Sequence, residues 1–470
     1  MTPSYFTTFA SKLEQTLGAA ELNRLGKEVG MAKRLREVHP ARLATAVISA
    51  LGTQQVKTLA DLLLRLNALV PHGVEYKPFH NQLKKEAFPV FTHRIFSSLL
   101  DKLVINTLAA VETSALAGFE DIILQDGSSF ALHNELAGVY PGRFTKISPA
   151  AVELHTQMSL LTGRPLRVIL TADKESERAH LPEASWLANK LFMADAGYED
   201  LGYFKKVIEA DGSIVCRIKG NTNPKIFAAW IDGEKYKFQT GVRLKQLREI
   251  HEGRHADLEA VWHRKGQTIK LRLVLVWNPA EQSHMALVTN LDHVRAPDPL
   301  VIRNVYRLRW QIELLFKEWK SYSGLHSFNT GKQTIAEGLI WASLAAAALK
   351  RFLALAAEQG HPGVEISTLR AARALFNVLD TVLEPLLFRV PVGPALQKTL
   401  AYLRQNARRA NPSRDRRTGR LTMGLIPENI RTGWAPGLLS LPDNVIELRA
   451  TATRQNSSVI SQENVDNIAA

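Results

Sequence analysis

Cysteine is almost absent from this chain of 470 residues, which contains only Cys216. A single thiol excludes a disulfide framework and the cysteine-rich kinds of zinc site. Residues 1–17 also lack the pattern of a secretory signal peptide. Together these absences predict a protein that works in a reducing cytoplasm.

Long apolar runs are missing as well. The longest, residues 339–349, is about half of the roughly 20 residues that a membrane-spanning helix needs, and Lys350 and Arg351 end it. We therefore expect a buried helix there and no membrane partner. The chain is long enough for roughly two to four domains, because a single core rarely exceeds about 250 residues.

Positive charge is what the sequence has in excess, with a formal net charge of +14. Residues 300–420 contain 19 Lys and Arg against 8 Asp and Glu, a net +11, so most of the excess lies in about a quarter of the chain. A phosphate backbone favours such a localised positive field through counterion release. Charge also serves solubility, so this pattern favours a polyanionic partner without identifying it.

Helical periodicity dominates residues 1–115, where leucines recur at spacings of three and four. The segment 58–66, a linker containing Pro71, and the basic segment 79–87 have the pattern of a helix-turn-helix. A plain helical bundle has the same pattern, and both alternatives stay open. We expect residues 1–115 to form a helical domain.

From Glu120 onward the pattern changes to that of short strands. We predict a strand at 122–124 ending at Asp126, a hairpin at 152–161 and 166–172, a helix at 182–190, and a strand at 191–194 stopping at Asp195. This order is typical of an α/β fold. Residues 214–292 are again rich in strand patterns and are interpreted as an insertion within that fold.

Helical periodicity returns beyond Arg303 and continues to about Asn406. The segment that contains Arg404, Arg408, Arg409, Arg414, Arg416, Arg417 and Arg420 is interpreted as a basic linker or arm. The last residues, 451–470, are polar enough to be disordered. We therefore predict a catalytic domain at 116–330, a helical C-terminal region with a basic arm at 331–450, and a tail.

The segment 305–320 is the most informative helix of the chain. At about 100° per residue, apolar side chains such as Leu308, Ile312 and Leu315 form one stripe. A separate face carries Tyr306, Arg309, Glu313, Lys317 and Lys320. One carboxylate is thus presented among cations and a phenol on a rigid element. An ordinary solvated face, with Glu313 and Lys317 as an i, i+4 pair, would have the same pattern.

Two further carboxylates favour phosphoryl transfer over that ordinary interpretation. Asp126 and Asp195 each follow a predicted strand, and neighbouring strands would bring them to one point, which Glu313 could reach from a helix across the sheet. An Asp-Gly after a strand is more often a turn than a ligand, so only the set of three is persuasive. In-line cleavage of a phosphodiester needs stabilised attacking and leaving oxygens. Two Mg²⁺ ions about 3.5–4 Å apart, held by carboxylates, provide this.

The spacing of Tyr306, Arg309, Glu313 and Lys320 resembles the Tyr-Arg-Glu-Lys signature of bacterial insertion-sequence transposases of family four, which belong to the Asp-Asp-Glu (DDE) group. The sequences Leu-Gln-Asp-Gly-Ser and Ala-Asp-Ala-Gly-Tyr, which contain the two aspartates, are similar to the other motifs of that family. The resemblance covers roughly residues 115–330.

This resemblance implies a ribonuclease-H-like catalytic core, interrupted by the β-rich insertion and flanked by helical N-terminal and C-terminal regions. It also implies that the helical domain of residues 1–115 binds the DNA ends. It implies two Mg²⁺ or Mn²⁺ ions held by Asp126, Asp195 and Glu313, and DNA phosphates held by Tyr306, Arg309 and Lys320. The expected activity is cleavage at the terminal inverted repeats of a mobile element and strand transfer into target DNA. Two protomers would meet in the synaptic complex, at the bacterial nucleoid.

Two other functions remain open. A catalytically silent DNA-binding regulator would use the basic region, but it would gain nothing from carboxylates clustered near phosphate. A nuclease on the same fold would not need long helical regions on both sides of the catalytic segment. Cleavage of element ends, compared with cleavage of random DNA, distinguishes these alternatives.

Overall fold

The computed structural model of the chain describes residues 3–411 and 430–434, except 55, 104–105, 249–252, 265, 326–329, 360 and 362. The predicted tail at 451–470 lies outside the described residues, as do Arg414, Arg416, Arg417 and Arg420 of the predicted basic arm.

A single mixed sheet of eleven strands forms the centre of the described structure. Its strands are β2 (Asp121–Ala131), β3 (Ala151–Ser159), β4 (Pro165–Ala172), β5 (Lys190–Ala194), β6 (Ser213–Arg217), β7 (Lys225–Ile231), β8 (Glu234–Lys235), β9 (Val242–Arg243), β10 (Ala256–Arg264), β11 (Gln267–Asn278) and β12 (Ser283–Thr289). Across the sheet their order is β4-β3-β2-β5-β6-β12-β11-β10-β7-β8, and β9 pairs with β7. The predicted α/β class is confirmed at this level.

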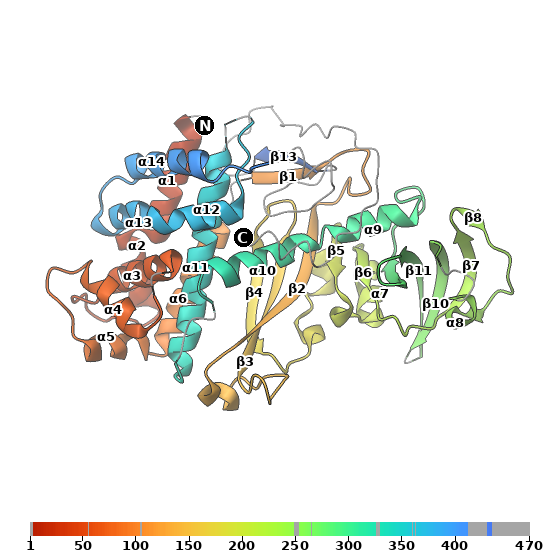
Figure 1. Cartoon of the computed structure of the whole chain (residues 1–470), viewed down its shortest axis with the longest axis horizontal. Helices are drawn as coiled ribbons and strands as arrows, with labels where there is room; N and C mark the ends of the chain where they lie inside the picture. The colour runs from red at the N-terminus through yellow and green to blue at the C-terminus, as the bar shows by residue number, and fades with distance from the viewer. Residues whose placement is uncertain are drawn as a thin grey trace.

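The strand β2 occupies the middle of the first half of the sheet, antiparallel to β3 and parallel to β5. Its apolar residues alternate between two cores: Leu124 packs in the core that includes α10 (Trp310–Tyr322), and Ile123 packs in the core that includes α7 (Leu201–Glu209). The strand is therefore covered on both faces, which explains its continuous apolar run. Figure 1 shows α10 lying across this part of the sheet.

Two local predictions were wrong. Strand β2 does not end at Asp126 but continues to Ala131, because residues 127–131 pair with β3 although they are mostly polar or small. Residues 182–190 form no helix and contain one 3-10 turn, η3 (Ala184–Leu187). Leu187 is the only buried residue of that turn, so no apolar stripe stabilises further helical turns.

The strands after β6 extend the same sheet instead of forming a separate one, since β12 pairs with β6 and β11, β10 and β7 follow outward. This extension lies at the right of Figure 1, away from the main helical body. A short helix, α8 (Leu244–Arg248), packs beside β9.

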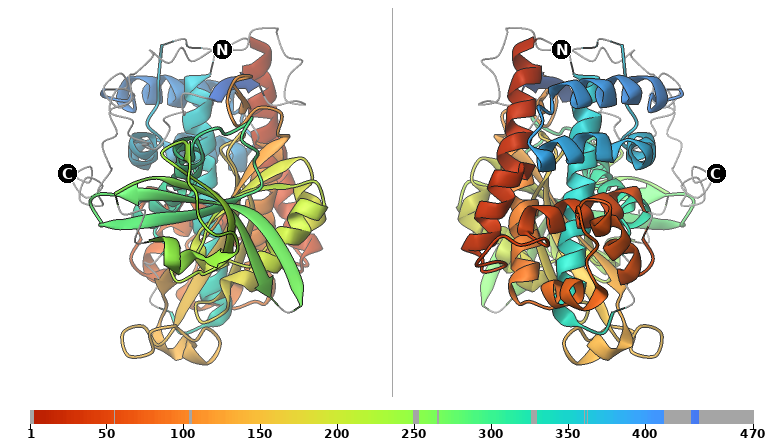
Figure 2. Two further views of the ribbon diagram at one scale, coloured as in Figure 1. Left: turned by 90° about the vertical axis from the view of Figure 1, so that its right-hand side faces the viewer. Right: turned by 90° about the vertical axis from the view of Figure 1, so that its left-hand side faces the viewer.

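Helices from both ends of the sequence pack together beside the sheet, as both views of Figure 2 show. The remaining helices are α1 (Pro3–Leu17), α2 (Ala19–Glu28), α3 (Pro40–Thr53), α4 (Leu59–Asn67), α5 (Tyr76–Leu83), α6 (Ala87–Lys102), α9 (Pro299–Arg307), α11 (Gln333–Glu358), α12 (Thr368–Ala374), α13 (Leu379–Phe388) and α14 (Gly393–Asn406). The 3-10 turns besides η3 are η1 (Asn134–Gly138), η2 (Glu177–His180), η4 (Ala196–Tyr198) and η6 (Leu375–Asn377).

Helix α11 is the central column of this helical body and contacts α3, α6, α12 and α14. It is long and apolar enough to cross a membrane, but 89% of its most apolar window is buried inside the protein. The prediction of a buried helix around residues 339–349 is therefore confirmed.

One strand falls in the segment that we predicted to be entirely helical. β1 (Asn106–Ala110) pairs antiparallel with β13 (Ile430–Trp434). The partner strand lies more than 300 residues further along the chain, so local periodicity carries no signal of this pairing.

Gly338 allows α11 to approach α6 closely. A Cβ atom there would lie 2.2 Å from Phe88 Cδ1 and 3.0 Å from Cγ of the same ring. We expect Gly338→Ala to lower the free energy of unfolding in chemical denaturation, because overpacking costs about 1–3 kcal/mol and outweighs the gain of roughly 1 kcal/mol in helix propensity. Gly73→Ala is the control, since nothing lies within 4 Å of a Cβ at Gly73; a Gly338 variant as stable as that control would contradict the prediction.

Candidate active site

The sheet places the first two predicted carboxylates next to each other. Gln125 of β2 pairs with Ala194 of β5 in parallel register, so the following residues, Asp126 and Asp195, lie side by side where β5 ends. Asp195 precedes the turn η4, and its side chain does not cap that turn.

The helix predicted at 305–320 is interrupted, which corrects the single helical face inferred from the sequence. Helix α9 ends at Arg307 and α10 begins at Trp310. Across the interruption the backbone bonds tighten to an i, i+3 pattern, with Arg309 N donating to Tyr306 O at 3.0 Å and Ile312 N donating to Arg309 O at 3.1 Å. Tyr306 therefore leaves the common face and reaches Asp195, whereas Arg309 stays beside Glu313 on the face that lines the site.

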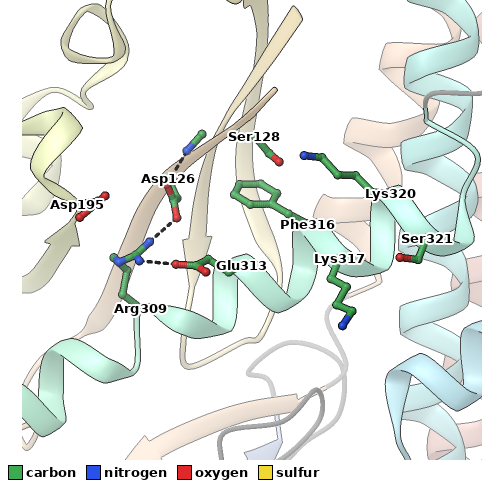
Figure 3. Close-up of a pocket in the computed structure, with 10 residues that line it drawn as sticks. Asp126, Ser128, Asp195, Arg309, Glu313, Phe316, Lys317, Lys320 and Ser321 are labelled. Carbon is green, nitrogen blue, oxygen red and sulfur yellow. Dashed lines mark hydrogen bonds and ion pairs between the residues drawn. The ribbon is translucent and has the colours of Figure 1, made fainter. Parts of the chain in front are cut away.

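Arg309 lies between two of the three carboxylates. Its guanidinium donates to Asp126 Oδ2 and to Glu313 Oε1, as the dashed lines in Figure 3 show. The Tyr306 hydroxyl donates to Asp195 Oδ1 at 3.2 Å, and Gly127 N donates to Asp126 Oδ1 at 2.9 Å. All three carboxylates thus have partners drawn from the residues around them.

The three carboxylates and Arg309 line one cavity of about 490 Å³. Its lining residues are Asp126, Gly127, Ser128, Asp195, Arg309, Glu313, Phe316, Lys317, Lys320 and Ser321. Figure 3 shows the acidic side chains toward one end, and Lys320 and Ser321 toward the other end of α10. Tyr306 does not line the cavity and is buried behind Asp195.

The electrostatics of the cavity favour additional positive charge at its acidic end. Burial raises the pKa of Asp126 to about 6. The positive charge of Arg309 opposes this rise, and the negative charges of Glu313 and Asp195 add to it. Burial also raises the pKa of Glu313. One guanidinium therefore does not fully compensate the clustered carboxylates.

Residues 117–349 match the family described as transposase DDE domain. The chain belongs to the DDE transposases of bacterial insertion sequences. It is accordingly a DNA-cleaving and strand-transferring enzyme. This finding confirms the predicted group, while the family-four signature of the transposase stays a prediction.

Several insertion-sequence transposases are similar to this one. The transposase for insertion sequence element IS231C of Bacillus thuringiensis subsp. berliner is 25% identical, covering 72% of this chain and 78% of its own. The transposase for insertion sequence element IS1151 of Clostridium perfringens is 21% identical, covering 52% of this chain and 60% of its own. Among solved structures, a piggyBac transposase synaptic complex with hairpin DNA has a TM-score of 0.40 at 10% identity, covering 85% of this chain and 83% of its own.

A divalent metal ion is the cofactor that the DDE family implies, and the residues of this cavity fit it in chemistry. Carboxylate oxygens are the hard ligands that Mg²⁺ and Mn²⁺ prefer, and Asp126 and Glu313 already share a cation, the Arg309 guanidinium. Within the described ranges, no three His, Cys, Asp or Glu side chains form a ready-made metal site. In this structure the Arg309 guanidinium occupies the space between Asp126 and Glu313.

The cavity includes residues that our sequence analysis did not assign to the site. Ser128 lies two residues after Asp126 on β2, so both side chains lie on the same face of the sheet, and strand alternation could have identified it. The helical wheel had already placed Lys317 on one face with Glu313, but we assigned it no role in the site. Glu318, the other acidic residue of α10, does not line the cavity and pairs with Arg351 at 2.7 Å.

Because the pKa of Asp126 is raised, replacing this residue with a neutral one should stabilise the folded protein, and the gain should depend on pH. A carboxylate with a folded-state pKa of about 6 and an ordinary value of 3.8 destabilises the folded state once it ionises. Without metal, Asp126→Asn should be roughly 2–3 kcal/mol more stable than the wild type above pH 6. That gain should shrink as pH falls toward 4, as measured by denaturation in EDTA. An Asn variant that is equally or less stable above pH 6 would contradict this electrostatic account.

Proposed function

We propose that Asp126, Asp195 and Glu313 hold two Mg²⁺ or Mn²⁺ ions and catalyse DNA cleavage and strand transfer by in-line displacement. The adjacency of the two aspartates across β2 and β5, with Glu313 lining the same cavity, is the observation that supports this most strongly. When bound, such ions stabilise the attacking and leaving oxygens of the phosphodiester.

The remaining side chains of the cavity would hold and orient DNA. Arg309 exchanges its carboxylate partners for a DNA phosphate when the ions bind, and its planar guanidinium suits such bidentate contacts. Lys320 neutralises a second phosphate. Tyr306, hydrogen-bonded to Asp195, orients that carboxylate and offers a neutral hydrogen bond near the cut.

The fold supports a wider proposal for the organisation of the protein. The order β4-β3-β2-β5-β6, with β3 antiparallel to its neighbours, is consistent with a ribonuclease-H-like core that the strands between β6 and β12 interrupt. We assign recognition of the terminal inverted repeats to the helices of residues 1–115. A second protomer would complete the synaptic complex, in the cytoplasm at the nucleoid. The Tyr-Arg-Glu-Lys spacing supports our assignment of the enzyme to family four.

A cleavage assay tests this function. We expect Mg²⁺-dependent strand breaks at the ends of the element that carries this gene, and no breaks in EDTA. Random DNA of equal length is the control for a nonspecific nuclease. End-binding without breaks in either Mg²⁺ or Mn²⁺ would instead support a silent DNA-binding regulator.

A further inference from the structure

The active-site cavity continues into a second cavity that the catalytic proposal does not use. This second space, about 430 Å³, is lined by Ala50, Leu51, Gln54, Val56, Lys57, Lys320, Ser321 and Gly324. Lys320 and Ser321 line both cavities. A continuous surface therefore leads from the carboxylates along α10 to the connection between α3 and α4.

Beyond Glu313, the charged side chains that line this surface are Lys317, Lys320 and Lys57. Among the described residues, no acidic side chain lines the second cavity, although the Asp61 carboxylate accepts from Lys57 N beside it. Lys320 is partly buried, burial lowers its pKa, and no hydrogen-bond or ion-pair partner for its amine exists in the part of the chain that the structure describes. A half-buried cation without a partner is costly unless a ligand supplies the opposite charge.

The N-terminal helices are fixed to α10 at this place. Gln54 ends α3 in a left-handed conformation, with φ of 54°, and its Nε2 donates to Ser321 O at 2.7 Å. Lys57 is exposed on the same connection, and no carboxylate lies within ion-pair distance of its amine among the described residues. The contact thus holds Lys57 beyond Lys320 on the path away from the carboxylates.

The spacing suits a nucleic acid backbone. Glu313 and Lys320 are seven residues apart, which is about 10 Å along a helix and about three base-pair steps of DNA rise. We infer that Lys57 binds a DNA phosphate a few nucleotides from the cleavage site, so that the α3–α4 connection guides the strand leaving the active site. This inference rests on the proposed function of the cavity and extends it to a residue of the N-terminal helices.

Salt-dependent binding tests this contact without any need for cleavage. The probe is a labelled duplex carrying the element's terminal repeat, bound in EDTA by the full chain. We expect Lys57→Ala to reduce the slope of log affinity against log salt concentration by about 1. The loss of DNA affinity relative to the wild type should therefore shrink by about threefold when the salt concentration rises roughly fourfold. Lys235→Ala, which removes an exposed lysine of β8 that lines neither cavity, is the matched control and should keep the wild-type slope. A Lys57 variant with the same slope as this control overturns the inference.

Cross-linking then locates the contact. Because the chain has one cysteine and Cys216 is buried, Lys57→Cys supplies a single accessible thiol for a photoactivatable reagent. Adducts should form within a few nucleotides of the cleavage site, and Lys235→Cys should give none there. Adducts confined to distant DNA, or no more adducts than with Lys235→Cys, would overturn the inference. Failure of the wild type to cleave element ends with any metal would reject the proposed function instead, while the binding slopes would still decide the role of Lys57.

Discussion

Asp126→Asn and Glu313→Gln should each reduce Mg²⁺-dependent cleavage of element ends by about 10³-fold or more. Each substitution removes one negatively charged oxygen ligand while keeping the size of the side chain. A loss of about 4 kcal/mol of transition-state stabilisation corresponds to this factor. The measurement is the single-turnover rate of strand breakage at saturating protein, so that weaker DNA binding does not contribute.

Binding to the same DNA in EDTA separates lost chemistry from lost folding, and both variants should retain it. Glu120→Gln is the matched control, because Glu120 is 63% exposed and lies just before β2 without lining the cavity. Its cleavage rate should equal that of the wild type. Wild-type rates in the Asp126 or Glu313 variant would rule out the proposed catalytic role of the carboxylates.

Arg309→Ala should destabilise the metal-free protein by about 3 kcal/mol or more, and Mn²⁺ should recover much of that loss. The guanidinium is 12% exposed and pairs with two carboxylates that are themselves 17% and 29% exposed. Removing one partner of a buried ion pair leaves uncompensated charge, which costs about 3–5 kcal/mol. A divalent ion can replace the missing cation between Asp126 and Glu313. The thermal shift on adding Mn²⁺ should therefore be larger for the variant than for the wild type.

A second buried ion pair provides the control for this prediction. Arg272 donates from Nε to Asp257 Oδ1 at 2.9 Å, and both side chains are less than 10% exposed. Neither residue lines the active-site cavity. Arg272→Ala should lose comparable stability, and Mn²⁺ should not restore it. Equal Mn²⁺ responses in the two variants would show that Arg309 does not share a position with a metal ion.

The elements that position the site were largely predictable, because local patterns encode them. Short strand patterns identified β2, β5 and the β3–β4 hairpin, whose strands flank the turn residues Gly163 and Arg164, and the structure confirms all three. The end of β2 was not predictable, since residues 127–129 have the composition of a turn but take their pairing from β3.

The interruption between α9 and α10 also escaped the sequence analysis. An i, i+3 turn at residues 308–309 leaves the apolar spacing of the segment nearly unchanged, so periodicity cannot detect it. The contact of Arg309 with Glu313 follows from i, i+4 spacing. Its contact with Asp126, 183 residues away, depends on how α10 crosses the sheet. Such contacts between distant segments are set by tertiary packing and have no local signature.

Iron-mediated cleavage of the polypeptide tests the central claim most directly. Fe²⁺ bound in place of Mg²⁺ generates hydroxyl radicals in the presence of ascorbate and peroxide, and these cut the backbone next to the metal. If Asp126, Asp195 and Glu313 share the metal ions, fragments should map to all three positions at once, and excess Mg²⁺ should suppress them together. Fragments at only one of these positions, or only elsewhere in the chain, would contradict a shared metal centre.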